Sequence, residues 1–192
     1  MSTVYKLPAS ASDAVTVEDY LAAEEAREVR HEYVGGLVYA MAGTTPEHNI
    51  IAGNLFAALR SHLRGKPCEV FFAEVKLRLE HAQNDIFYYP DVMVTRGARD
   101  RSQPSKRFPK AIIEVLSDAT ARIDRREKFW AYMSIPTLEE YVLVAQDRAE
   151  ATVFRRAGQW RAEPRTKLEE TIALPSLDFT MALSAIYEGV KV

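Results

Sequence analysis

One acidic residue, Glu114, stands within the otherwise apolar run at 111–116 (AIIEVL). Burial of an unpaired carboxylate is costly, so a carboxylate there needs a cation, a set of hydrogen bonds or a metal ion. The alternation of a strand places Glu114 on the same face as Ile112 and Leu116. Two interpretations follow: the carboxylate pairs with a structural arginine, or it belongs to a functional site.

A second acid, Asp91, follows Pro90 inside a β-rich run at 86–94. The proline interrupts strand pairing and can expose the next residue where the sheet opens locally, although a Pro-Asp pair also often closes a turn. If Asp91 and Glu114 lie on neighbouring central strands, their carboxylates can meet, and a hard divalent cation relieves the repulsion between them. Because Mg²⁺ prefers one or two carboxylates, waters and phosphate oxygens, the pair predicts a Mg²⁺ or Mn²⁺ site.

A lysine near such a site would orient an attacking water or stabilise negative charge that develops on phosphorus. Lys128 is expected on the helix after the Glu114 strand, and Lys76 shares an expected strand face with Glu74. Each lysine also has a simpler interpretation. Lys128 can form an i, i+4 ion pair with Asp124, and Lys76 can be a solvated strand residue.

The elements that must position these residues are predicted from hydrophobic periodicity and from cap and turn signals. A helix is expected over 17–33, and a second begins at Pro46, after the cap Thr45, and ends near Gly65. The runs at 70–79 and 86–94 each predict one strand, with a hairpin loop between them. Further strands are expected at 37–42, 111–116, 140–145 and 151–156, a helix at 123–135 and a short closing helix within 174–190. This order predicts an α/β or α+β domain with a mixed sheet.

Length and composition predict one globular domain. The chain has 192 residues, of which 47% are hydrophobic and 27% charged, and this excludes the disordered, collagen-like and low-complexity classes. We expect a single domain over 1–192, with a core at about 17–156 and a C-terminal extension at 157–192. The single cysteine, Cys68, allows no intrachain disulfide. Without a signal-peptide pattern or an apolar run of transmembrane length, a reducing, cytoplasmic location is expected.

The net charge of −2 hides a strong local polarity. Residues 1–50 hold three basic and eight acidic residues, a net of −5, whereas residues 96–128 hold ten basic and five acidic residues, a net of +5. A local field of this kind attracts anionic partners, although a charge run is more often only a solvated face.

Six short motifs follow one another over most of the chain, from about Tyr20 to Val144. They are Tyr33-Val34-Gly35-Gly36, Pro46-Glu47-His48-Asn49, Tyr89-Pro90-Asp91, Glu114-Val115-Leu116-Ser117, Asp124-Arg125-Arg126-Glu127-Lys128 and Glu139-Glu140-Tyr141. In this order they resemble the PD-(D/E)XK nuclease superfamily, and more closely its bacterial family of putative restriction endonucleases, the Uma-type branch. The resemblance implies a restriction-endonuclease-like core, a mixed central sheet flanked by helices.

The resemblance also implies metal-dependent hydrolysis of phosphodiester bonds, with Asp91 and Glu114 as ligands of Mg²⁺ or Mn²⁺. The lysine of the (D/E)XK motif would stand at position 116, where this chain has a leucine. In this branch Lys128 looks like its replacement. Glu74 lies where relatives can carry an acid and is a possible further ligand. His48, the third residue of its helix, either faces the site or only caps and packs.

Contacts with phosphates are expected from arginines of the basic loop, Arg99, Arg101 and Arg107, and they would make binding salt-dependent and weakly sequence-selective. No helix-turn-helix or zinc-finger pattern offers base readout, and cleavage of both DNA strands favours a homodimer with two active sites. Two alternatives stay open. One is a nuclease-like module that binds nucleic acid or protein without catalysis, and the other is a hydrolase that uses carboxylates without metal.

Overall fold

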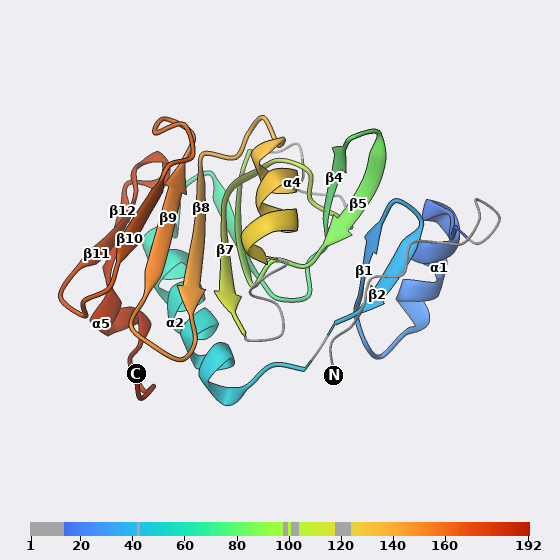
Figure 1. Ribbon diagram of the computed structural model, residues 1–192. Coiled ribbons are helices and arrows are strands. Elements are labelled where there is room, and N and C mark those ends of the chain that lie inside the picture. The colour runs from blue at the N-terminus through green and yellow to red at the C-terminus, as the bar shows by residue number, and fades with distance from the viewer. Residues whose placement is uncertain (1–13, 42, 98–99, 101–103, 118–123) are drawn as a thin grey trace.

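The computed structural model describes residues 14–41, 43–97, 100, 104–117 and 124–192, and a six-stranded sheet forms its centre (Figure 1). The strands are β3 (Cys68–Phe72), β6 (Val92–Arg96), β7 (Pro109–Leu116), β8 (Glu140–Ala145), β9 (Ala151–Arg155) and β10 (Ala162–Arg165), in the order β10-β9-β8-β7-β6-β3. β7 and β8 run parallel, and the other neighbours are antiparallel. The mixed sheet and the α/β class predicted from the sequence are therefore confirmed.

A smaller sheet of four strands lies beside the central one and contains the first strands of the chain (Figure 1). Its members are β1 (His31–Val34), β2 (Leu37–Ala40), β4 (Leu77–His81) and β5 (Asn84–Tyr88), in the order β2-β1-β5-β4. Helix α1 (Val17–Ala26) packs on this sheet through Tyr20, which contacts Tyr33 of β1 and Phe87 of β5.

Both faces of the six-stranded sheet are covered. On one face lie α2 (Pro46–His62), the pair β11 (Thr171–Leu174) and β12 (Phe179–Ala182), and α5 (Leu183–Ile186); on the other lie α4 (Phe129–Met133) and part of the smaller sheet. In β7, residues 111, 113 and 115 face α2, whereas Ile112 and Leu116 face α4. Glu114 shares the α4 face, as the alternation predicts. No described helix is both long and apolar enough to cross a membrane.

The C-terminal residues 157–192 belong to the same packing as the core. β10 extends the central sheet, and Ile172, Leu174, Leu183 and Ile186 are fully buried in the cluster around α2. Sequence patterns missed the four-residue strands β10, β11 and β12. What was expected as an extension therefore completes one face of the central sheet.

Two predicted elements are wrong, and in both cases tertiary pairing overrides local propensity. The helix expected over 17–33 ends at Ala26, and residues 31–34 form β1 because they pair with both β2 and β5. The strand expected over 70–79 is divided near Ala73, whose φ is 52°, into β3 and β4 of different sheets. The run at 86–94 is divided into β5 and β6 at Pro90, where the sequence indicates an interruption. Asp91 therefore stands where the chain passes from the smaller sheet to the central one.

Glu24 is a buried carboxylate of α1. It links this helix to the segment between β5 and β6. It accepts hydrogen bonds from the Tyr89 hydroxyl at 2.9 Å and from the His31 backbone N–H at 2.8 Å. We expect Glu24→Ala to lower the free energy of unfolding by about 2 kcal/mol, because two buried donors lose their acceptor. Denaturant unfolding measures the loss. Its neighbour Glu25 is exposed, so Glu25→Ala should change stability by less than about 0.5 kcal/mol; equal losses in both variants would contradict the account.

Candidate active site

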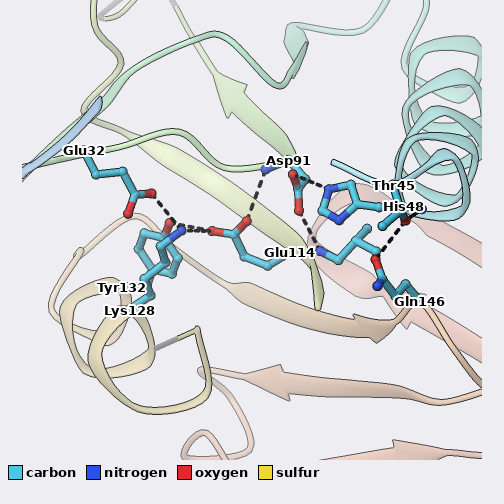
Figure 2. Close-up of polar contacts among 9 residues, drawn as sticks. Glu32, Thr45, His48, Asp91, Glu114, Lys128, Tyr132 and Gln146 are labelled. Carbon is cyan, nitrogen blue, oxygen red and sulfur yellow. Dashed lines mark hydrogen bonds and ion pairs between the residues drawn. The ribbon is translucent and has the colours of Figure 1, made fainter. Parts of the chain in front are cut away.

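Asp91 and Glu114 meet where β6 begins and β7 ends (Figure 2). The antiparallel register pairs Val92 with Ile113, so the next position brings Asp91 opposite Glu114. Each carboxylate accepts a backbone N–H from the other segment. Glu114 Oε2 accepts from Asp91 N at 3.2 Å, and Asp91 Oδ2 accepts from Val115 N at 2.7 Å. The two acids singled out in the sequence therefore lie side by side at one end of the central sheet.

Lys128 brings a positive charge to Glu114 from the α4 face (Figure 2). It is the last residue of a π-helical turn that leads into α4, a wide turn of a kind that recurs at functional sites. Its Nζ lies 2.8 Å from Glu32 Oε1 and 3.6 Å from Glu114 Oε1, and its side chain is only 7% exposed. The ammonium therefore points into the site. The side chain of Asp124, its other expected partner, lies outside the described part of the chain.

Two further residues of the cluster, Tyr132 and Glu32, were missed by sequence reasoning. The Tyr132 hydroxyl donates to Glu114 Oε1 at 2.7 Å. Burial, and then the nearby Glu114 charge, raise the pKa of Tyr132 well above its ordinary value, so the hydroxyl stays protonated and remains a donor. A usable signal existed for Tyr132, which stands one helical turn after Lys128. Glu32 had none, because its segment was assigned to a helix.

His48 approaches Asp91 from the opposite face, at the first turn of α2 (Figure 2). The Thr45 hydroxyl caps this helix by accepting the His48 backbone N–H at 3.2 Å, and it donates to Gln146 Oε1 at 3.2 Å. The ring Nε2 of His48 then lies 2.9 Å from Asp91 Oδ1. Of the two alternatives left open by the sequence, the structure places His48 against the acid pair, where its ring orients the Asp91 carboxylate.

The contacts described for Glu74 and Lys76 lie with other residues than the acid pair. The Glu74 side chain is 73% exposed and forms an ion pair with Arg30 at 3.4 Å. Lys76 lies in the link between β3 and β4, where its backbone carbonyl accepts the Lys106 N–H at 2.8 Å. The shared strand face expected for Glu74 and Lys76 is absent from this described segment, because the chain changes sheets there.

The basic loop is described only in part. Arg99 and Arg101 lie outside the described residues, and Arg107 is exposed. The carboxylate of Asp100, which is 2% exposed, accepts the backbone N–H of Arg107 at 3.0 Å. This contact holds the second half of the loop against the protein and leaves the Arg107 side chain in solvent.

The donor set of the site suits a hard cation. Within the described residues, no three or more His, Cys, Asp and Glu side chains are grouped as a metal cage. Mg²⁺ and Mn²⁺ need fewer protein ligands, because waters and substrate oxygens complete their octahedral shells. Each carboxylate oxygen of Asp91 makes one hydrogen bond and keeps a lone pair, and this side chain is 17% exposed. Asp91 can therefore bind such an ion, and Glu114 lies beside it with one oxygen that accepts from Asp91 N and one that accepts from the Tyr132 hydroxyl.

Known proteins are similar to this chain in sequence or in fold. The sequence model of the Uma2 family, described as "Putative restriction endonuclease", matches residues 17–184. An uncharacterized protein of Synechocystis sp., slr1290, is 32% identical over 186 residues, which cover 95% of this chain and 96% of that protein. A second one, sll1609, is 32% identical over 151 residues, which cover 76% and 84%. The crystal structure of a putative nuclease belonging to DUF820 from Anabaena variabilis has the same fold, with a TM-score of 0.72 at 16% identity, over 91% of this chain and 98% of that one.

Proposed function

Because the chain belongs to the Uma2 family of putative restriction endonucleases, we propose that it is a metal-dependent endonuclease that hydrolyses phosphodiester bonds of DNA. The observation that carries the proposal is the convergence of Asp91, Glu114 and Lys128, with 3.6 Å between the ammonium and the Glu114 carboxylate. Two carboxylates can hold a divalent cation, and an ammonium beside them can offset charge on phosphorus. Metal-dependent hydrolysis of a phosphodiester uses both capacities.

The proposed roles follow from the contacts of each side chain. Asp91 and Glu114 would hold Mg²⁺ or Mn²⁺, which supplies a Lewis acid for the phosphoryl oxygens and raises the nucleophilicity of water. The His48 ring orients the Asp91 carboxylate, and the Tyr132 hydroxyl orients that of Glu114. The Lys128 ammonium orients the attacking water or stabilises the negative charge that develops on the phosphoryl oxygens.

Binding of the substrate is assigned to the basic segment 96–128, whose net charge is +5 from ten basic and five acidic residues. Its arginines would contact backbone phosphates, so affinity should depend on salt more than on sequence. Because one site cuts one strand, we propose a homodimer for double-strand cleavage. The expected setting is the reducing cytoplasm, where Cys68 stays a free thiol.

Arg107 offers a direct test of the phosphate contacts, since its side chain is exposed. Arg107→Ala is expected to weaken DNA binding about equally for all sequences and to reduce the slope of log K against log salt by about 1. Fluorescence anisotropy at several salt concentrations measures this slope. Arg161→Ala, which removes an exposed arginine between β9 and β10, serves as the control with an unchanged slope. Equal slopes for both variants would count against Arg107 as a phosphate contact.

The function itself is tested by incubating the purified protein with supercoiled DNA, single-stranded DNA and RNA, each with Mg²⁺, Mn²⁺ or EDTA. We expect DNA cleavage with either metal and none in EDTA. Cleavage that survives chelation would replace the proposal with a metal-free acid/base hydrolase. Salt-dependent binding without any cleavage would identify a nuclease-like binding module instead.

A further inference from the structure

Glu32 holds the ammonium of Lys128 more closely than Glu114 does. Its Oε1 lies 2.8 Å from Lys128 Nζ, against 3.6 Å for Glu114 Oε1. Glu32 belongs to β1 of the four-stranded sheet, whereas Glu114 belongs to β7 of the central sheet. Figure 2 shows the lysine nitrogen between the two carboxylates. The site is therefore built across the junction of the two sheets.

The place of Glu32 is set by the chain segment that also supplies Asp91. β1 pairs with β5, and β5 ends at Tyr88, three residues before Asp91. The ring of Tyr88 lies under the ammonium, with 5.2 Å between Lys128 Nζ and the ring centroid. The pairing of β1 with β5 thus fixes Glu32 relative to both Lys128 and Asp91.

The Glu32 carboxylate balances the positive charge of the buried Lys128 ammonium. The side chains of Lys128 and Glu32 are 7% and 13% exposed, so water solvates neither of them well. An ammonium in such a position needs an anion beside it. Once Glu114 is committed to a divalent cation, its negative charge no longer balances Lys128. Within the described part of the chain, Glu32 still places an anion 2.8 Å from the ammonium.

We propose that Glu32 is a positioning residue that holds the Lys128 ammonium in place beside Glu114 during the reaction. The inference rests on the proposed function, because it assigns a task within the same site. Loss of the Glu32 charge should therefore lower kcat. The opposite role, in which Glu32 withholds Lys128 from the substrate, predicts a higher kcat for the same change.

The kinetic test compares wild type with Glu32→Gln, which keeps the shape and one acceptor oxygen but removes the charge. We expect kcat to fall about 10- to 100-fold, as for other residues that orient a catalytic group, with KM within about two-fold, because Lys128 acts in the transition state. Glu32→Asp should recover part of the loss. Glu80→Gln, at an exposed position on β4 of the same sheet, should match wild type. An unchanged or higher kcat in Glu32→Gln would overturn the proposal.

A second measurement needs no catalytic activity. The free energies of unfolding of wild type, Glu32→Gln, Lys128→Met and the double variant form a cycle that isolates the coupling of the two residues. We expect the double variant to lose less stability than the sum of the single losses, because each change breaks the same ion pair. Additive losses would overturn the pairing. If wild type cleaves no substrate, the proposed function fails, and the cycle still decides whether Glu32 holds Lys128.

Discussion

Asp91→Asn is expected to lower the rate of DNA cleavage about 10³-fold, because an amide cannot provide the negative charge that holds a hard cation. A loss of about 4 kcal/mol of transition-state stabilisation, within the range that a catalytic metal ion supplies, corresponds to this factor. Asparagine keeps the size of the side chain and an oxygen that can accept the Val115 N–H. The fold should therefore persist, and the loss should be one of chemistry.

Single-turnover cleavage at saturating Mg²⁺ measures the effect of Asp91→Asn, and thermal unfolding verifies that the variant is folded. The matched control is Asp147→Asn, in the turn after β8, where the Asp147 side chain is 57% exposed. Its rate should stay within about two-fold of wild type, as expected for a surface substitution. An Asp91→Asn rate as high as that of the control would remove Asp91 from the site.

Lys128→Met is expected to lower kcat about 10²- to 10³-fold, the loss that follows removal of one group that stabilises transition-state charge. Its effect on metal binding should differ from that of Asp91→Asn. The substitution removes a positive charge 3.6 Å from Glu114 Oε1, so Mn²⁺ affinity should rise rather than fall. Steady-state kinetics and Mn²⁺ titration calorimetry, run on the same preparations, separate the two roles.

Stability needs its own control for Lys128→Met. The change leaves Glu32 and Glu114 without their shared cation, which is expected to cost about 3 kcal/mol of unfolding free energy. The assays should therefore be run at a temperature well below the unfolding midpoint of the variant. Lys167→Met, at an exposed position, controls for loss of a surface charge. Wild-type kcat in folded Lys128→Met would show that this lysine takes no part in the reaction.

Much of the site was predictable because its signals are local. An acid in a six-residue apolar run had to be buried on a central strand, and its parity placed it on the same face as Ile112 and Leu116. The proline before Asp91 marked the point where strand pairing stops. Lys128 was one of two candidate lysines and was selected by the family resemblance; its helix packs on the Glu114 face. The strand signals of Glu114 and Pro90 need only the neighbouring residues.

The positions of the other site residues depend on which strands pair. No local sequence pattern indicates this pairing. β1 holds Glu32 in place because it pairs with both β2 and β5, whereas the local composition of residues 17–33 favours a helix. At the break near Ala73 the backbone stays beside Asp91, but the Glu74 side chain is exposed and pairs with Arg30, although alternation continues through the break. Glu32 thus joins the site, and Glu74 pairs elsewhere, for the same reason. The chain between β3 and β6 forms two strands of a second sheet, and β1 pairs with one of them.

The fold alone does not determine the function of this protein. Many functions occur on one fold, so the chemistry must come from the side chains at the site. Here Asp91, Glu114 and Lys128 meet at one end of the central sheet, and contacts from both faces reach them: His48 from the α2 face and Tyr132 from the α4 face. Loss of any member of this set tests the site, whereas loss of a core residue tests only the fold.

The most direct test of the central claim is scission of supercoiled plasmid DNA by wild type and Asp91→Asn, purified in parallel and assayed with Mg²⁺ and with EDTA. The account predicts that wild type with Mg²⁺ converts the plasmid to nicked and linear forms. Asp91→Asn with Mg²⁺, and both proteins in EDTA, should leave the plasmid supercoiled. Equal scission by the two proteins with Mg²⁺ would contradict the claim that the Asp91–Glu114 pair forms the catalytic site.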